Sequence, residues 1–315
     1  MNWSELPRPI VCLAPMDGIT DSAYRRIVRE VSRETILFSE FTSADGYLRS
    51  DKIRRRLDYR PEEHPYFVQL FGNNPDAFAE TARALEQAGV AGIDINMGCP
   101  ARKIVASQHG SGLMQDVKLA CRIVGAVARA VPLPVSVKTR LGWHDARDLP
   151  EFAGALADAG AALITIHGRT YDQAFHGEAD WAPIYALKRR LAVPVLGNGD
   201  VADVADGLRR MGPLDGFMIG RAAIGNPWAF RPGPAAPPDT VERLDVVRRH
   251  YAYAREARAE RHALIEFRKH LAAYLRGFTG AKAARVRLMR MESEAEFLAA
   301  LDELAHRAPP LAKAG

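Results

Sequence analysis

The sequence has little of what marks a membrane-inserted or disulfide-stabilised protein. Only three cysteines occur among 315 residues, an odd number without close pairing, which excludes a disulfide framework and a cysteine-based zinc site. No apolar run approaches the roughly 20 residues that span a bilayer. The N-terminus, Met-Asn-Trp-Ser-Glu-Leu-Pro, lacks the charged start and apolar centre of a signal peptide. We therefore expect a cytoplasmic protein without a membrane anchor, and no obligate protein partner is evident.

Positive charge is present in excess and is unevenly distributed. The formal net charge is +5. Residues 49–60 contain six basic side chains against two acidic ones, and residues 261–290 contain eight basic side chains against Glu266 alone. Such clusters favour a polyanionic partner, although an arginine-rich composition by itself is also typical of many enzymes.

Eight short apolar runs, most of them separated by amphipathic stretches, predict parallel strands joined by crossover helices. A chain of this length accommodates one barrel of about 250 residues and a small appendage. We therefore predict an α/β fold, a (β/α)₈ TIM barrel over residues 1–230. The runs cover residues 10–14, 35–40, 66–71, 92–97, 135–140, 163–167, 193–198 and 216–220.

The composition changes after residue 230. Residues 231–240 contain four closely spaced prolines and predict a stiff linker. Only helical patterns follow, which predicts an all-helical domain over residues 241–308 and a frayed tail over 309–315. The expected helices cover residues 241–258, 263–278, 281–290 and 294–306.

Cys99 is the first candidate catalytic residue. The strand predicted over residues 92–97 would place this thiol just past the strand's C-terminal end, where barrel enzymes position their active-site groups. Pro100 cannot donate to a strand ladder, so the thiol lies on a loop, which passes Gly110 and Gly112 before a helix begins near Asp116. The other two cysteines fit small buried hydrophobes better.

The ends of the seventh and eighth runs are candidates for a phosphate site. Gly197 to Asp200 and Gly220 with Arg221 fall where many barrels bind phosphate through backbone N–H groups, and a guanidinium grips two phosphate oxygens. The alternative is that these glycines only form tight turns. On the fifth run, Lys138 faces away from the neighbouring valines, and a buried ammonium needs an anionic or polar partner.

Residues 94–100, Asp-Ile-Asn-Met-Gly-Cys-Pro, resemble the signature of the tRNA-dihydrouridine synthases, flavoenzymes that reduce uridine in tRNA. The resemblance extends from Leu-Ala-Pro-Met-Asp-Gly-Ile-Thr-Asp at 13–21 to Phe-Arg-Lys-His-Leu at 267–271. One departure is Val105, where bacterial members usually have asparagine or glutamine. That difference concerns the contacts of the loop rather than the assignment.

The resemblance implies a cofactor, flavin mononucleotide (FMN), with NADPH or NADH as the reductant. Hydride from the flavin would reach C6 of the uracil, and Cys99 would protonate C5. Asn96 would hydrogen-bond the uracil, although it also suits a turn at a strand end. Alone, His167 would be read as structural and Gln69 as uninformative. The residues that match FMN contacts of the family are Pro15, Met16, Gln69, Lys138, His167, Asn198, Gly199, Asp200, Gly220 and Arg221.

The basic C-terminal segment is the predicted site of tRNA binding. Its cations alternate with Phe267, Tyr274 and Phe278, and a target base must be unstacked before a flavin can reach it. A solvated helix face is the alternative for any single residue. The candidate RNA contacts are Arg268, Lys269, Arg276, Arg285 and Arg287.

Two other functions fit parts of the sequence. An FMN-dependent barrel oxidoreductase could act on a free pyrimidine or another small molecule, but the helical extension and its arginines argue against it. A non-catalytic RNA-binding protein could keep the barrel as a scaffold, but the presence of Cys99 and Lys138 argues against that function.

Overall fold

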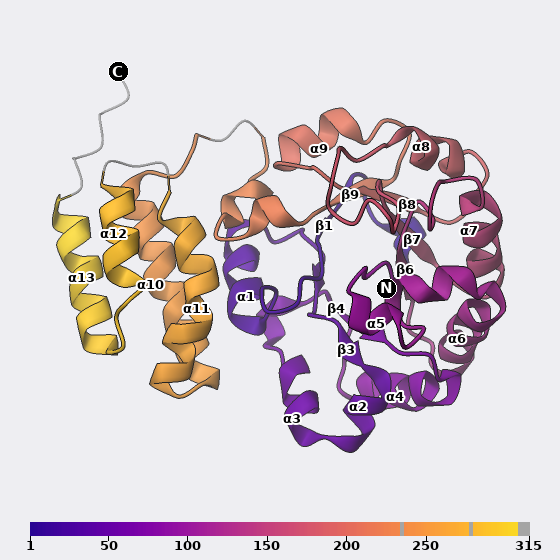
Figure 1. Cartoon of the computed structure of the whole chain (residues 1–315), viewed down its shortest axis with the longest axis horizontal. Helices are drawn as coiled ribbons and strands as arrows, with labels where there is room; N and C mark the ends of the chain where they lie inside the picture. The colour runs from indigo at the N-terminus through magenta and orange to yellow at the C-terminus, as the bar shows by residue number, and fades with distance from the viewer. Residues whose placement is uncertain (234–235, 277–279, 308–315) are drawn as a thin grey trace.

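The computed structural model describes residues 1–233, 236–276 and 280–307. Figure 1 shows a ring of helices around a parallel barrel, with a group of four helices beside it. The strands follow the order β1-β9-β8-β7-β6-β5-β4-β2, and a parallel bridge between Cys12 and Ile36 joins the two ends. The predicted barrel is therefore confirmed. Its strands are β1 (Ile10–Leu13), β2 (Leu37–Phe38), β3 (Thr42–Ser43), β4 (Tyr66–Phe71), β5 (Gly92–Met97), β6 (Val135–Arg140), β7 (Leu163–His167), β8 (Val195–Asn198) and β9 (Gly216–Ile219).

The second and seventh predicted runs differ from the observed strands. The run over residues 35–40 yields only β2, and the following β3 also pairs with β4. Within the seventh run, strand β8 begins only at Val195, because Pro194 has no N–H to donate. The third, fourth, fifth and sixth runs match their strands at both ends, and the first and eighth runs extend one residue past theirs.

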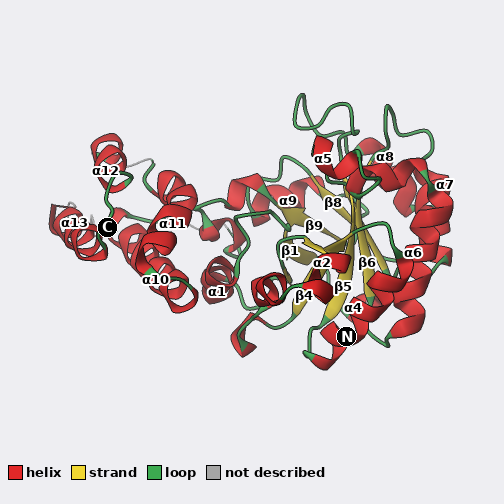
Figure 2. Ribbon diagram, turned by 60° about the horizontal axis from the view of Figure 1, so that its bottom comes forward, coloured by secondary structure: helices red, strands yellow, loops and turns green. Residues whose placement is uncertain are grey.

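Helices cover the outside of the barrel (Figure 2). Several begin at an acidic or amide side chain that accepts a hydrogen bond from a free backbone N–H, as Asp21, Asn74 and Asp116 do. Asp116 therefore caps the helix that was expected to begin near it. The helices of this part are α1 (Ser22–Val31), α2 (Ala44–Arg49), α3 (Asp51–Arg54), α4 (Pro75–Gln87), α5 (Arg102–Val105), α6 (Val117–Ala130), α7 (Leu149–Asp158), α8 (Ala182–Lys188) and α9 (Val204–Arg210).

Short 3-10 helices fill several connections. One lies at the N-terminus, where Trp3 is fully buried and packs 4.6 Å from the ring of Phe67. Cys12 belongs to the same apolar cluster, so its expected role as a buried hydrophobe is confirmed. The 3-10 helices are η1 (Trp3–Glu5), η2 (Arg55–Leu57), η3 (Pro61–Glu63), η4 (Gly110–Gln115), η5 (Arg221–Ala223) and η6 (Pro227–Phe230).

Four helices follow the proline-rich segment, as predicted. The second was expected over 263–278 but spans 260–274, and residues 277 and 278 lie outside the described residues. The predicted tail at 309–315 also lies outside them. The apolar core of these helices includes Ile27 of α1 and Trp228 of η6, so it is continuous with the barrel surface. The helices are α10 (Thr240–Ala257), α11 (Glu260–Tyr274), α12 (Ala281–Leu288) and α13 (Glu294–Arg307).

No helix in the described ranges combines the length and the apolar character needed to cross a membrane.

Two histidines are buried where α10 and α11 meet α1. The rings of His250 and His270 lie 4.6 Å apart, and that of His270 lies 4.6 Å from the ring of Tyr24. Nε2 of His270 bonds the carbonyl of Ile19 at 3.1 Å, whereas Nδ1 has no hydrogen-bond partner among the described residues. Burial lowers the pKa of His270 to about 4 and lowers that of His250 well below its usual value.

We expect these histidines to make the protein sensitive to mild acid. Both folded-state pKa values lie below the unfolded value, so the unfolded chain binds more protons and stability falls as pH drops from about 6.5 toward 4. For His270 alone, the free energy of unfolding should fall by up to about 1.4 kcal/mol for each unit by which the pH drops. Urea unfolding at several pH values measures this slope. His270→Gln, which can still donate to Ile19, should reduce it, and an unchanged slope would contradict this explanation.

Candidate active site

Polar side chains from adjacent strands face the inside of the barrel toward its C-terminal ends. In the strand register, Asp94 stands opposite Gln69 on one side and Ser136 on the other, and Asn96 stands opposite Lys138. Residues two apart on a strand share a face, so these side chains form successive polar layers. The uppermost layer of the same region consists of Arg140, His167 and Asn198.

The loop that carries Cys99 is held from both sides. The side-chain oxygen of Asn96 accepts hydrogen bonds from the backbone N–H groups of Gly98 at 3.1 Å and Cys99 at 2.9 Å. Arg140 donates from Nε to the carbonyl of Gly98 at 2.7 Å, and Ser111 N donates to the carbonyl of Cys99 at 3.1 Å. Burial raises the pKa of the half-buried Cys99 thiol, so near neutral pH the thiol keeps its proton and can donate it.

Gly110 allows the loop to close over the thiol. Its φ is +56°, and a Cβ there would lie 2.9 Å from the carbonyl oxygen of Cys99 and 3.1 Å from its Cβ. Any other residue would displace the cysteine. Val105, the departure from the family pattern, ends α5, and its carbonyl accepts from Gln108 N at 2.9 Å. The bond is made by the backbone, so a valine side chain is compatible with it.

Lys138 lies at the centre of a cluster of cations. Its Nζ donates to Oδ1 of Asn198 at 3.0 Å, across the barrel interior. Burial, assisted by Arg140, lowers the pKa of Lys138 to about 8, and burial lowers that of Arg140 to about 10. Burial and the neighbouring cations lower the pKa of His167 to about 2, so this imidazole is neutral. The positive charge here exceeds the negative charge available to balance it.

Asp200 organises the ends of β7, β8 and β9. Its carboxylate accepts from Arg169 at 2.7 Å and from Arg221 at 3.0 Å. Burial opposes ionisation, but these donors and Ala179 N outweigh it and hold the pKa of Asp200 below its usual value. Gly199 has a φ of +116°, and a Cβ there would lie 2.8 Å from Cδ2 of His167. Gly199 is therefore required by a close approach.

The other predicted cofactor residues occupy the same rim. Met16 lies in the loop after β1, where its N–H donates to Thr20 Oγ1 at 3.0 Å, and Pro15 precedes it. Gly220 follows β9, but a Cβ there would lie 3.6 Å from the nearest atom, so close packing does not require glycine at that position.

Arg140 and Arg169 are part of the site but were not among the predicted residues. Arg140 is 2% exposed and also donates to the carbonyls of Thr170 and Ala174. Arg169 is 2% exposed and lies 3.3 Å from Nε2 of His167. The sequence did indicate both arginines at strand ends. Arg140 ends a predicted strand in Lys-Thr-Arg, and Arg169 follows one in His-Gly-Arg.

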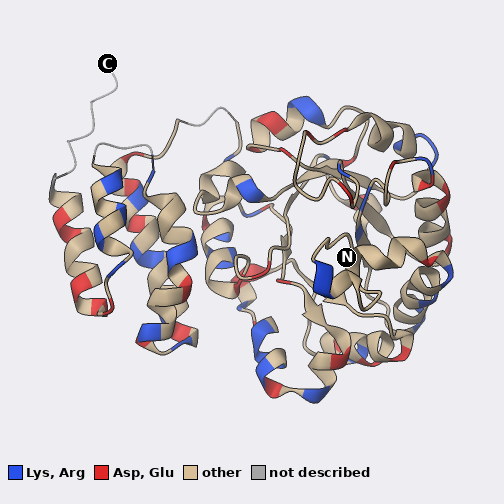
Figure 3. Ribbon diagram, viewed as in Figure 1, with Lys and Arg blue, Asp and Glu red and all other residues tan. Residues whose placement is uncertain are grey.

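A groove of about 1080 Å³ lies beside the barrel mouth, between the 49–60 segment and helices α10 and α11. It brings the basic 49–60 segment opposite the C-terminal helices, from which Arg258 and Lys269 line it, and Figure 3 shows the Lys and Arg residues of both parts in blue. Arg60 reaches Glu256 of α10 at 3.4 Å. The cations that line the groove are Arg26, Lys52, Arg54, Arg55, Arg56, Arg60, Arg258 and Lys269.

The predicted RNA-binding cations do not all face this groove. Lys269 lines it and donates to the carbonyl of Gly18 at 3.2 Å, in the loop after β1. Arg268 and Arg285 donate to the carbonyls of Met291 and Leu275. Arg287 of α12 pairs with Glu303, and Arg276 is exposed after α11. Only Lys269 of this set therefore lies in the groove wall.

Comparison with known proteins identifies relatives over nearly the whole chain. Residues 12–309 match the family model described as dihydrouridine synthase (Dus). A probable tRNA-dihydrouridine synthase 1 from Synechocystis sp. is 36% identical, over 93% of this chain and 85% of the relative. A probable tRNA-dihydrouridine synthase 2 from Bacillus subtilis is 35% identical, over 96% of this chain and 95% of the relative.

Solved structures support the barrel fold at low sequence identity. The old yellow enzyme homologue from Zymomonas mobilis has a TM-score of 0.51 and 14% identity, covering 72% of this chain and 89% of that chain. A 2-naphthoyl-CoA reductase has a TM-score of 0.54 and 12% identity, covering 69% of this chain and 48% of that chain.

Proposed function

Because the chain belongs to the dihydrouridine synthase family of oxidoreductases, we propose that it reduces specific uridines of tRNA to 5,6-dihydrouridine, with FMN as cofactor and NADPH or NADH as reductant. The observation that supports this proposal best is the Cys99 thiol on a loop held by Asn96 and Arg140, beside the polar, cation-rich end of the barrel. A proton donor next to a site for an anionic ligand suits flavin-dependent reduction of a carbon–carbon double bond.

The residues at the barrel mouth fit a flavin phosphate and ring. Arg140 and Arg169 are buried and Lys138 is half-buried. Burial lowers the pKa of Lys138 and of Arg140, which an anionic ligand would oppose. Arg221 is exposed at 56% of its side chain and can turn from Asp200 toward a phosphate. Neutral His167 can donate or accept one hydrogen bond. Of these residues, Lys138, His167 and Arg221 match the family's FMN contacts.

When bound, FMN would supply the hydride that reaches C6 of the uracil. The protein's own part is to protonate C5, and Cys99 can do so because its proton remains on sulfur near pH 7. Asn96 uses its oxygen for the Cys99 loop and one N–H for Gln69. Its second N–H is left for a uracil oxygen, so the predicted substrate contact and the turn role are compatible.

We place the tRNA across the groove between the 49–60 segment and helices α10 and α11. Phosphates would contact cations on both walls. The groove reaches Asp17 and Gly18 of the loop after β1, which also contains Met16. A nucleotide bent out of an RNA in the groove would thus be delivered toward the barrel mouth.

Two observations test the function. Flavin absorption in the visible spectrum of the purified protein would argue against a non-catalytic RNA-binding protein. Mass analysis of tRNA from cells with and without the gene should show a gain of about 2 Da on each reduced uridine when the gene is present, because two hydrogens are added. Unchanged tRNA in a cell that makes flavin-loaded protein would favour reduction of a small molecule.

We expect Arg221→Ala to weaken FMN binding about tenfold, because one charge-assisted contact to phosphate is lost. Flavin fluorescence on release from the protein measures the affinity. Arg209→Ala, which removes an exposed cation from α9, serves as the control. Equal FMN affinity in the Arg221 variant and the control would remove Arg221 from the phosphate site.

A further inference from the structure

Asp94 is a buried carboxylate to which the proposed reaction gives no part. It lies on β5, two residues before Asn96, and is 1% exposed. Each of its oxygens accepts one hydrogen bond, Oδ2 from Gln69 Nε2 and Oδ1 from Ser136 Oγ, both at 2.6 Å. By accepting from Gln69, Asp94 also affects the residue that the other end of this amide contacts.

A continuous chain of hydrogen bonds links Asp94 to the Cys99 loop. Since Nε2 of Gln69 is directed at Asp94, its Oε1 faces Asn96 and accepts from Nδ2 at 2.8 Å. Oδ1 of Asn96 then faces the loop and accepts from the N–H groups of Gly98 and Cys99. At every link the donor lies on the Cys99 side and the acceptor on the Asp94 side.

Both ends of this chain require that order. A backbone N–H can only donate, and an ionised carboxylate can only accept. The two amides between them could otherwise turn by half a revolution and exchange oxygen for nitrogen at little steric cost. Without an acceptor at position 94, Gln69 could turn its oxygen away from Asn96. Asn96 could then direct N–H groups at the N–H groups of the loop, and the loop would lose its anchor.

We propose that Asp94 is a positioning residue for Cys99, which it places by fixing the amides of Gln69 and Asn96 in the orientation that binds the Cys99 loop. The catalytic consequence rests on the proposed function. The effect of Asp94 on the position of the loop is independent of that function, because it can be measured through the reactivity of the thiol.

Three substitutions separate this role from general stability. Asp94→Leu removes the acceptor while keeping a side chain of similar length. Asp94→Asn keeps an oxygen for Gln69, because its amide nitrogen can donate to the Ser136 hydroxyl. Ser136→Ala is the matched control, since it removes the other hydrogen bond of the same carboxylate and leaves the chain to Cys99 intact. Asp94→Ala replaces the leucine variant if the latter does not fold.

The first measurement is the rate of Cys99 alkylation by iodoacetamide, followed by peptide mass spectrometry. A loosened loop exposes the thiol, so we expect alkylation to be about fivefold to tenfold faster in Asp94→Leu. It should stay within about twofold of the parent in Asp94→Asn and Ser136→Ala. Cys121, which bonds the carbonyl of Ala155, is the internal reference for global unfolding and should not change.

The second measurement is single-turnover tRNA reduction with flavin in excess. Misplacement of the thiol should slow Asp94→Leu by about tenfold to a hundredfold and leave the other two variants near the parent. Parental alkylation and turnover in Asp94→Leu would overturn the proposal, as would an asparagine or Ser136→Ala variant that matches the leucine one. If the parent itself does not reduce tRNA, the proposed function fails while the alkylation comparison still decides the role of Asp94.

Discussion

Replacing Cys99 with alanine is expected to slow reduction of tRNA by about 10² to 10⁴ in a single turnover, the usual range for loss of a general acid. The thiol is the proposed proton donor for C5, and its raised pKa keeps the proton available. The substitution removes no group that anchors the loop, because Asn96 and Arg140 bond its backbone. The measurement is the rate at which tRNA reoxidises a pre-reduced flavin.

Binding should survive this change. Flavin content and tRNA affinity should match the parent, because neither depends on the sulfur. Cys121→Ala is the control, since that thiol lies on α6, outside the barrel mouth, and its loss should leave the rate unchanged. Reduction by Cys99→Ala at nearly the parental rate would assign the protonation of C5 to another group.

The barrel and the position of Cys99 could be predicted from the sequence because both depend on local patterns. Short runs such as 92–97 and 163–167 are too short for helices and are fully buried as strands. The first of these ends at Met97, and Pro100 follows in the loop that contains Cys99. The length of β2 was overestimated, because the chain leaves the strand at residues 39 and 40, where Ser39 Oγ donates to the carbonyl of Glu40 and the Glu40 carboxylate accepts from Gly18 N.

Which side chains contact one another could not be predicted from such local patterns. Arg140 and Arg169 were visible as basic residues at strand ends, but both are buried against backbone carbonyls of the loop after β7, such as those of Ala174 and Gly177. The polar chain from Asp94 to Cys99 likewise depends on the register of β4 against β5. Sequence alternation indicates which face a residue takes but not which partner it meets.

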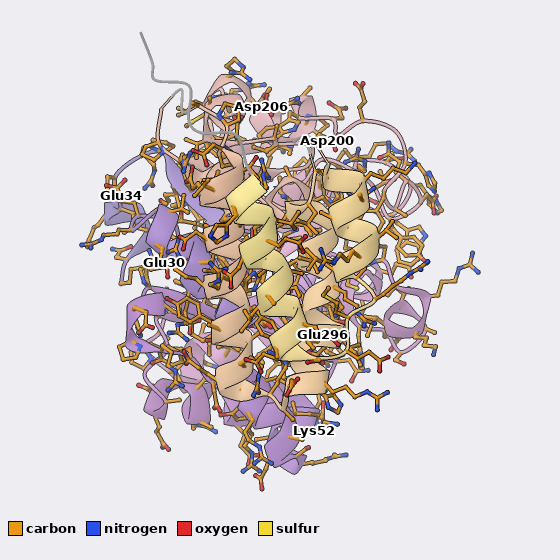
Figure 4. The ribbon with its side chains drawn as sticks, turned by 90° about the vertical axis from the view of Figure 1, so that its left-hand side faces the viewer. Glu30, Glu34, Lys52, Asp200, Asp206 and Glu296 are labelled. Carbon is orange, nitrogen blue, oxygen red and sulfur yellow. The ribbon has the colours of Figure 1, made fainter. Side chains whose placement is uncertain are left out.

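The 49–60 segment was predicted to be basic, but the groove that it forms with α10 and α11 is a product of the fold, and among the described residues Lys269 is the only cation of 261–290 that lines it. Figure 4 looks at the molecule from the side of α13 and shows Lys52 at the lower edge of this face, well separated in this view from Asp200. Lys52 and Arg55 line the groove and form no ion pair among the described residues. By contrast, Arg285 and Arg287 of α12 already have partners within the chain.

This difference predicts how two double variants will change tRNA binding. Each phosphate contact contributes about 0.7 to 0.9 to the slope of log affinity against log salt. Lys52→Ala with Arg55→Ala should lower that slope by about 1.5 and the affinity at 0.1 M salt by roughly tenfold or more. Arg285→Ala with Arg287→Ala should also lower both, but less, because phosphate must displace the existing partners. Filter binding at four or more salt concentrations measures slope and affinity together.

The matched control removes the same charges from another face. Lys118→Ala with Arg122→Ala changes α6, which lies across the barrel from the four C-terminal helices in Figure 1, and should leave the salt slope unchanged. FMN content and flavin reduction by NADPH should be the same in all three double variants, because none of these cations lies at the barrel mouth. If the α12 variant lost more affinity than the groove variant, RNA would bind mainly along α12. If neither differed from the α6 control, both basic segments would be solvated surface and the proposed groove would be wrong.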